Sequence, residues 1–261
     1  MKSKPKPVTV GSVWEGKNCG KFEVVEYRTA TDIYIIFSAT GYKRSATAAH
    51  IRSGNVRDPY SVTVRGVGFI GEGQYMANSR SHHEPAHTAW RSMMCRCYSD
   101  DYHKAKPTYK DCKVSSEWHN FQNFARWYYD NIPDNGEGYQ LDKDLKVHGN
   151  KTYSPNTCLF LPSNINSFLC FSTKTSKSSL IGSSFSNGKG RFASYCNNPF
   201  TGKCDHLGYF DNDIDAHLVW RKKKYEHAIN LANQQEREEV KTALLNWAQA
   251  LKEFRIHPID N

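Results

Sequence analysis

The sequence LDKDLKVHGNKTYSPNTCLF, residues 141–160, is the stretch on which the interpretation of the fold depends. LDKDLKV and TCLFLP predict two short strands around a polar loop, and SNINSFL, which follows, predicts a short helix. The loop gathers Asp, Lys, His and Asn, which are side chains able to bind a metal ion or move protons. The alternative interpretation is a solvated hairpin whose polar residues only form turns and end strands.

Upstream of this stretch, residues 1–75 predict a small β module. Apolar and β-branched runs are separated there by Gly, Asn and Asp-Pro turns, and no helical period is visible in FEVVEY, DIYIIFSA and SVTVRGVGFIG. The glycines of GVGFIGEGQY, at 66–75, predict tight turns or a close approach of the backbone to another segment.

Residues 76–180 hold the hairpin and two helices before it. A connector, SRSHHEPAH, carries three His and is interpreted as a solvated linker rather than a metal site. Two apolar stripes follow at spacings of three and four, which predicts helices with one face in a core. The stripes are Trp90, Met93, Met94 and Cys97, and then Trp118, Phe121, Phe124 (or Ala125) and Tyr128.

Downstream, residues 181–231 predict a three-stranded sheet followed by a helix. The strands are LIGSSFS, RFASYCN and DHLGYF. The helix is expected to begin at a cap formed by Asp211 or Asn212, and its apolar residues are Ile214, Leu218, Tyr225 and Ile229. Residues 232–261 predict an amphipathic helix that packs on its own domain or on a partner chain through Val240, Leu244, Trp247, Leu251 and Phe254. The expected fold class is therefore α+β with several domains.

The charge of the chain indicates a polyanionic partner. The formal net charge is +9 and the pI is near 9.1. The basic excess is spread over the first three segments, as expected for a footprint along nucleic acid, because each neutralised phosphate releases counterions. No apolar run has the length of a membrane helix or a signal core, so we expect a soluble, cytoplasmic chain.

The eight cysteines are interpreted as reduced thiols, because the chain is long and shows no export signal. Structural Zn²⁺ is the less favoured alternative. Four cysteines bracket the polar loop, but they offer one C-x-C and no C-x-x-C pair; they are Cys95, Cys97, Cys112 and Cys158.

Residues 90–170 resemble phage homing-type endonucleases of the His-Asn-His class. The resemblance is carried by W-x-x-M at 90–93, Arg96-Cys97-Tyr98, Tyr109, Cys112-x-Val114, Trp118-x-x-Phe121-x-x-Phe124, LDKD at 141–144, and Tyr153, Pro155 and Cys158. It implies a strand-strand-helix site that binds one Mg²⁺ (or Mn²⁺), with Asp142 as one metal ligand and Asn166, less favourably Asn164, as another.

The chain departs from that family at two telling positions. Lys143 stands where the family has its His, and an ordinary Lys is protonated and cannot act as a base. Thr157 stands at the family's middle Asn, with Asn156 one residue earlier. Three alternatives remain open: His148 is the base, Asp144 shares the metal or acts as base, or Lys143 stabilises phosphate charge. The candidate catalytic residues are Asp142, Lys143, Asp144, His148 and Asn150, and the candidate metal ligands are Asp142, Asp144 and Asn166.

The third segment resembles the ethylene-response-factor type DNA-binding domain of plants. Arg191-Phe192-Ala193, His206-Leu207-Gly208-Tyr209-Phe210 and the helix from Ala216 to Tyr225 carry that similarity. It implies a sheet that lies against the major groove of duplex DNA, with contacts from Arg191, Lys203 and Tyr209. The basic run from Arg221 to Lys224, including Lys223, is interpreted as a solvated helix face or a phosphate contact. A second footprint in the first segment would use Lys43, Arg44, Arg52, Arg57 and Arg65.

Together these features predict a DNA endonuclease, nicking or cutting both strands, that acts in homing between phage genomes in the cytoplasm of an infected bacterium. A DNA-binding protein that has lost catalysis is the alternative, because Lys143 and Thr157 replace the family's most telling residues. An RNA-binding or structural phage protein is supported by the basic charge only. The oligomeric state stays open, with a monomer favoured.

Overall fold

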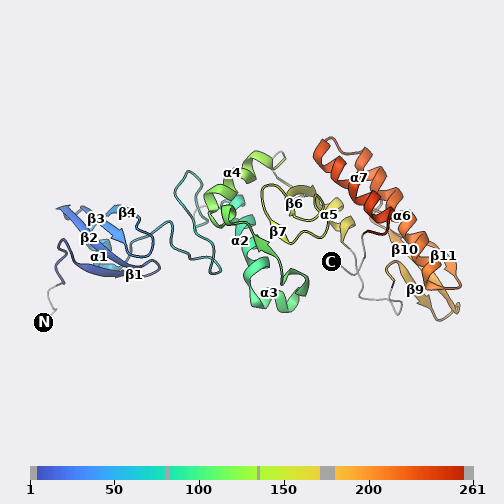
Figure 1. Cartoon of the computed structure of the whole chain (residues 1–261), viewed down its shortest axis with the longest axis horizontal. Coiled ribbons are helices and arrows are strands. Elements are labelled where there is room, and N and C mark those ends of the chain that lie inside the picture. Colours follow the sequence, from blue (N-terminus) through green and yellow to red (C-terminus); the bar gives the residue numbers. More distant parts are fainter. Residues whose placement is uncertain (1–4, 80–82, 134–135, 171–179, 256–261) are drawn as a thin grey trace. The chain divides into compact units, whose positions relative to one another are not determined.

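The computed structural model describes residues 5–79, 83–133, 136–170 and 180–255. It contains helices and largely antiparallel sheets, which confirms the α+β class (Figure 1). Two compact units divide the chain, one formed by Met1–Ala105 and Val114–Tyr128, the other by Lys106–Lys113 and Tyr129–Asn261. The chain therefore passes between the units more than once, and the predicted domain boundaries at 75, 180 and 231 stay predictions. No helix in the described ranges has the length and apolar character needed to cross a membrane.

The first unit opens with a four-stranded antiparallel sheet in the order β1-β2-β3-β4. Ile33, Ile35 and Phe37 are fully buried at alternate positions, as expected for a strand with one face in a core. The predicted strands at 22–27 and 32–39 are confirmed, whereas β1, β4 and helix α1 were not predicted. The elements are β1 (Val13–Gly16), β2 (Gly20–Thr29), β3 (Asp32–Phe37), β4 (Lys43–Ala46) and α1 (Ala48–Ser53).

The tract at 61–71 is not the strand that its apolar residues predicted. It forms a tight loop closed by a bridge between Val64 and Gly68. Phe69 then exchanges backbone hydrogen bonds with His119 and Phe121, 3.0 Å each. A Cβ at Gly71 would lie 2.1 Å from Oδ1 of Asn120, so only glycine fits at this contact. The prediction of a close backbone approach is confirmed, while the strand prediction was wrong.

Two helices supply most of the remaining core of the first unit. The two predicted stripes are buried, because Trp90, Met93 and Met94 on α2 and Trp118, Phe121 and Phe124 are fully inaccessible to solvent. His87, from the predicted His-rich linker, is also buried, with its ring 5.0 Å from that of Phe121. The elements are α2 (Pro85–Tyr98), α3 (Asp100–Ala105), η2 (Ser116–His119) and α4 (Phe121–Asn131), with β5 (Lys113–Val114) at the unit boundary in the sequence.

The second unit contains the hairpin predicted from residues 141–160, but the predicted strand over 141–147 was wrong beyond Asp142, because residues 143–147 form bends. Strand β6 (Tyr139–Asp142) pairs antiparallel with β8 (Leu159–Pro162), so that Asp142 lies opposite Leu159. Helix α5 (Ser163–Leu169) follows at once, as predicted. The connection between the strands contains the short strand β7 (Thr152–Tyr153), and the turn η1 (Pro107–Tyr109) also belongs to this unit. The strand-strand-helix order expected for the site is therefore present.

A three-stranded antiparallel sheet in the order β11-β10-β9 packs on helix α6 in the same unit. The strands are β9 (Ser183–Ser186), β10 (Arg191–Asn197) and β11 (Cys204–Phe210), which confirms the three predicted strands. Helix α6 (Asp213–Asn233) begins at Asn212, whose side chain accepts the backbone N–H of Asp215. The predicted apolar face is confirmed in part: Tyr225 and Ile229 pack against the core. The first half was wrong, because Ile214 is 59% exposed and Leu218 41% exposed, while Trp220 is buried.

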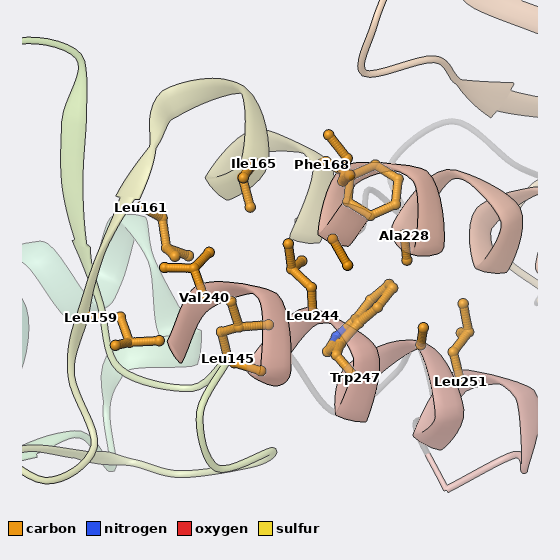
Figure 2. Packing of buried hydrophobic residues seen from close by; sticks show 14 of the residues in the cluster. Leu145, Leu159, Leu161, Ile165, Phe168, Ala228, Val240, Leu244, Trp247 and Leu251 are labelled. Carbon is orange, nitrogen blue, oxygen red and sulfur yellow. The ribbon is translucent and has the colours of Figure 1, made fainter. Parts of the chain in front are cut away.

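The last helix, α7 (Glu238–Lys252), joins the hairpin and α6 in one hydrophobic core. Leu161 of β8 and Ile165 of α5 lie beside α7, and the rings of Phe168 and Trp247 are 5.8 Å apart (Figure 2). Each fully buried side chain of this size stabilises the fold by about 1.5–3 kcal/mol. The prediction that α7 packs within its own domain is confirmed. The predicted stripe is buried except for Phe254, which is 50% exposed and lies beyond the end of the helix.

Candidate active site

Asp142 ends strand β6 and fixes the turn that follows it. Its Oδ1 accepts the backbone N–H groups of Asp144 and Leu145, at 3.1 and 2.8 Å. Leu145 is buried in the core shared with α7, so the turn is anchored on that core. Burial, and then the negative charge of Asp144, raise the pKa of the Asp142 carboxyl to about 7. The carboxyl groups of Asp142 and Asp144 are therefore close neighbours, and these two side chains together with that of Lys143 are called the pocket.

Lys143 points into this pocket rather than into solvent. The residue is 7% exposed, and its Nζ donates to Oδ2 of Asp144 at 2.7 Å. The rings of Tyr109 and Tyr153 each lie with their centroids 5.8 Å from Nζ. Burial alone would lower the pKa of this ammonium, but the charge of Asp144 and the hydrogen bond outweigh burial and raise the pKa. The charged form of Lys143 is therefore stabilised by Asp144.

Asn150 holds the loop between the strands. Its Nδ2 donates to the carbonyls of Lys143 and Thr152, at 2.6 and 2.7 Å, and its Oδ1 accepts the N–H of Thr152 at 3.1 Å. Thr157, at the family's Asn position, also bonds within the loop, because its hydroxyl donates to the carbonyl of Thr152 at 2.8 Å. Asn150 thus positions the pocket by closing the chain around Lys143.

His148 is not brought to the carboxylates. The side chain is exposed, and within the described ranges it forms no hydrogen bond or ion pair with Asp142 or Asp144. His148 was predicted as the general base because it lies in the same hairpin as Asp142 and Asp144. Residues 146–149 form the exposed tip of the loop, so sharing a loop does not place the imidazole at the pocket.

Asn166 lies on the side of β6 that carries Asp142. Its Nδ2 donates to Oε1 of Gln140 at 2.5 Å, and Gln140 is two residues before Asp142 on the same strand. Side chains two apart on a strand share a face, so Asn166 of α5 reaches the face that ends in Asp142. Its amide oxygen accepts no hydrogen bond from the described residues.

Oxygen atoms are the donors available for a cation at this pocket. Asp142 and Asp144 supply two carboxylates, a donor type that suits Mg²⁺, whereas the side chain of Asn166 bonds to Gln140. In the described ranges, no group of three or more His, Cys, Asp or Glu side chains is arranged to hold a metal ion. Cys158 is buried beside the pocket, and burial raises the pKa of its thiol to about 12. That thiol is therefore protonated at neutral pH.

The three-stranded sheet presents aromatic and imidazole side chains to solvent. Tyr195 and Tyr209 are 41% and 37% exposed, and the His206 ring lies 5.1 Å from Tyr195 and 4.7 Å from Tyr209. Arg191 is exposed at the start of β10 and pairs with Asp211 at 2.9 Å. Lys203 is exposed in the turn before β11. These side chains stand on one module and can contact an extended ligand together.

Two residues of the basic run on α6, Arg221 and Lys224, are not solvated, which corrects the prediction for them, while Lys222 is exposed. Arg221 is 5% exposed, and its Nε donates to the carbonyl of Leu251 at 2.6 Å. Lys224 is 4% exposed and donates to the carbonyl of Phe168. Both are buried because Arg221 contacts α7 and Lys224 contacts α5, which sequence spacing on α6 alone does not reveal. Lys223 is half-buried, and its Nζ pairs with Oε2 of Glu226 at 3.4 Å.

In the first unit, the predicted contacts Arg44 and Arg65 are exposed but engaged. Nη1 of Arg44 donates to the carbonyl of Arg57 at 2.9 Å. Nη2 of Arg65 reaches Sγ of Cys95 at 3.5 Å, from a backbone with φ of 51°. Both guanidinium groups are held by these contacts, and a role toward DNA stays a prediction.

Sequence reasoning missed three residues of the pocket and the sheet. Tyr109 and Tyr153 were used only for the family resemblance, although their rings flank the Lys143 ammonium. Tyr109 lies far from the hairpin in sequence, so no local spacing connects the two. His206 of β11 lies opposite Tyr195 of β10, and this pairing across two strands could not be located from local spacing.

Comparisons of the chain with models of known families, with curated proteins and with solved structures gave no match. The family resemblances therefore rest on the motif residues themselves.

Proposed function

We propose that the chain is a metal-dependent endonuclease that hydrolyses phosphodiester bonds in duplex DNA. The observation that carries the proposal is the paired carboxylates of Asp142 and Asp144 at the end of β6, within a hairpin followed directly by α5. Paired carboxylates on a strand end are a common way to place a divalent cation against a phosphate. The basic composition of the chain agrees with a polyanionic substrate.

In this proposal Asp142 and Asp144 hold the cation, with the amide oxygen of Asn166 as a further donor. When bound, Mg²⁺ or Mn²⁺ supplies charge that stabilises the phosphate as it gains negative charge during hydrolysis. The backbone N–H groups of Asp144 and Leu145 keep the carboxylate of Asp142 in one orientation. In the absence of metal, Lys143 pairs with Asp144, and Asn150 ties the backbone of Lys143 through its carbonyl.

Binding of the duplex is assigned to the three-stranded sheet. Arg191, Lys203 and Tyr209 lie exposed on or beside it, with His206 next to Tyr209. Phosphate contacts from the basic side chains would give affinity, and side chains that reach base edges would give sequence preference. Arg221 is withdrawn from this set because it is buried, and Lys223 is retained as a phosphate contact at the edge of α6.

The experiment is incubation of the purified full chain with supercoiled plasmid and Mg²⁺ or Mn²⁺. We expect nicked or linear product, and we expect Asp142→Asn to reduce the rate by about 100-fold or more, because a charged ligand of the cation becomes neutral. Asp101→Asn, an exposed Asp on α3 in the other unit, is the matched control and should cleave at the wild-type rate. Cleavage that survives Asp142→Asn unchanged would remove the assignment of the pocket.

A second candidate function is duplex DNA binding without cleavage. The ion pair between Lys143 and Asp144 favours it, because one of the two carboxylates already has a cation. In a gel-shift assay with the same DNA, binding without any cleavage under either metal would support this function. We then expect Arg191→Gln and Tyr209→Ala to weaken binding, and Asp142→Asn to leave it unchanged.

A further inference from the structure

The Lys143 ammonium lies where a bound cation would act on the carboxylate pair. It is 2.7 Å from Oδ2 of Asp144, and Asp144 is in turn a close neighbour of Asp142. The Lys143 side chain is 9% exposed, while that of Asp144 is 34% exposed. Asp144 therefore already has a positive charge beside it, while its side chain is still partly exposed to solvent.

Two further features hold the ammonium in this position. The rings of Tyr109 and Tyr153 each lie 5.8 Å from Nζ, a distance at which an aromatic ring attracts a cation. The backbone of Lys143 is tied by Asn150, whose Nδ2 donates to the Lys143 carbonyl at 2.6 Å. The position of the ammonium is thus built by side chains from three parts of the second unit.

A divalent cation and this ammonium compete for the same negative charge. An ion that binds both Asp142 and Asp144 would lie within a few ångströms of Nζ, where two positive charges repel each other strongly in a partly buried pocket. We infer that Lys143 is a resident cation of the carboxylate pair and that it weakens divalent-metal binding until its side chain leaves Asp144. Metal affinity at this pocket is thereby set by a residue that does not bind the metal.

This inference rests on the proposed function for the assignment of Asp142 and Asp144 as metal ligands. It is tested without DNA and without turnover. Mn²⁺ is titrated into the full chain, and free Mn²⁺ is measured by electron paramagnetic resonance. We expect Lys143→Met to bind Mn²⁺ about tenfold more tightly than the wild type or better, because a positive charge next to the ligands is removed.

Two variants separate the ion pair from general charge effects. Lys146→Met removes an exposed lysine of the same loop and should leave the affinity for Mn²⁺ unchanged. The double variant Lys143→Met with Asp144→Asn should lose the gained affinity, because the carboxylate that the metal would take is absent. Equal Mn²⁺ affinity in the wild type and in a folded Lys143→Met variant would overturn the inference, as would an equal gain in Lys146→Met.

A second measurement covers the case in which Lys143→Met does not fold. The ¹⁵N and ¹H signals of the Lys143 ammonium in the wild type should be lost or shifted as Mg²⁺ is added, because the side chain leaves Asp144. A signal that stays unchanged at every Mg²⁺ concentration would overturn the inference. A gain of Mn²⁺ binding without plasmid cleavage would support the resident cation and count against the nuclease. Plasmid cleavage by the wild type, with no gain of Mn²⁺ affinity in Lys143→Met, would support the nuclease and count against the resident cation.

Discussion

The second unit buries a lysine in two regions, and the two sites treat the charge in opposite ways. Lys143, in the hairpin loop, has its ammonium on the Asp144 carboxylate, and its pKa is raised. Lys224, on α6, donates to the carbonyl of Phe168 and lies 3.7 Å above the Phe168 ring. Burial is the largest influence on Lys224 and lowers its pKa to about 8. The comparison teaches that burial disfavours both ammonium groups and that a carboxylate reverses the outcome at one of them.

The largest expected change in the free energy of unfolding follows from a substitution in the hairpin loop. Lys143→Met should lower the free energy of unfolding by about 2–3 kcal/mol at neutral pH, because the Asp144 carboxylate loses its partner. This loss is smaller than that expected for a fully buried ion pair, because Asp144 is partly exposed. The loss should be nearly constant from neutral to moderately alkaline pH, because the native pKa of Lys143 is above its value of 10.5 in the unfolded chain. Urea unfolding of both proteins measures it.

A Lys143→Met variant as stable as the wild type would break the comparison, because the Asp144 ion pair would then contribute nothing. Lys146→Met is the matched control, since its exposed side chain lies in the same loop. That control should stay within about 0.5 kcal/mol of the wild type.

The second expected change in the free energy of unfolding follows from a substitution on α6, and this change is a gain in stability. The native pKa of Lys224 is about 8, below the 10.5 of the unfolded chain, so the unfolded chain binds more protons between these pH values. The stability contributed by this site should therefore rise as the pH rises through that range. Lys224→Met should gain about 2 kcal/mol at neutral pH, since the burial penalty of the charge exceeds the loss of the bond to Phe168.

The measurement is urea unfolding of the wild type and Lys224→Met from pH 7 to pH 10. The advantage of the variant should shrink as the pH rises, because the wild-type amine loses its charge at the higher values. Lys222→Met, on the same helix but exposed, is the control and should show no such trend. A Lys224→Met variant that is less stable at every pH would show that the Phe168 contact outweighs burial.

The contrast between the regions also explains what the sequence could and could not predict. The hairpin, α5, the three strands and the Asn212 cap follow from local patterns, and all are present. The burial of Arg221 and Lys224 does not follow, because α5 and α7 cover them from elsewhere in the chain. Apolar residues on α6 therefore predicted its buried face only in part: Tyr225 and Ile229 pack against the core, while Ile214 is exposed and a lysine is buried.

The candidate site also contains residues whose contacts follow from the local sequence and residues whose contacts depend on the fold. Asp142, Lys143 and Asp144 are neighbours in sequence, and the motif indicated that the two carboxylates lie together, but it did not predict the turn or the bond between Lys143 and Asp144. The tyrosine rings around the ammonium were not predictable as a site, because Tyr109 reaches the pocket only through the fold. His148 shows the converse, since its place in the loop suggested a role but the tip of the loop is exposed.

The smallest expected effect tests whether the loop, rather than the ion pair alone, keeps Lys143 inside. Asn150→Ala removes two donors and one acceptor that tie the backbone of Lys143 to Thr152. We expect a loss of about 1 kcal/mol in unfolding free energy, because these groups can bond to water in the part-buried loop.

The more informative readout is Mn²⁺ affinity, which should rise about threefold, since a looser loop lets the ammonium leave Asp144 more often. Asn156→Ala, in the same connection but with an exposed side chain, should change neither quantity. If Asn150→Ala destabilises the chain and leaves Mn²⁺ affinity unchanged, Asn150 only supports the fold, and the difference between the two buried lysines is due to Asp144 alone.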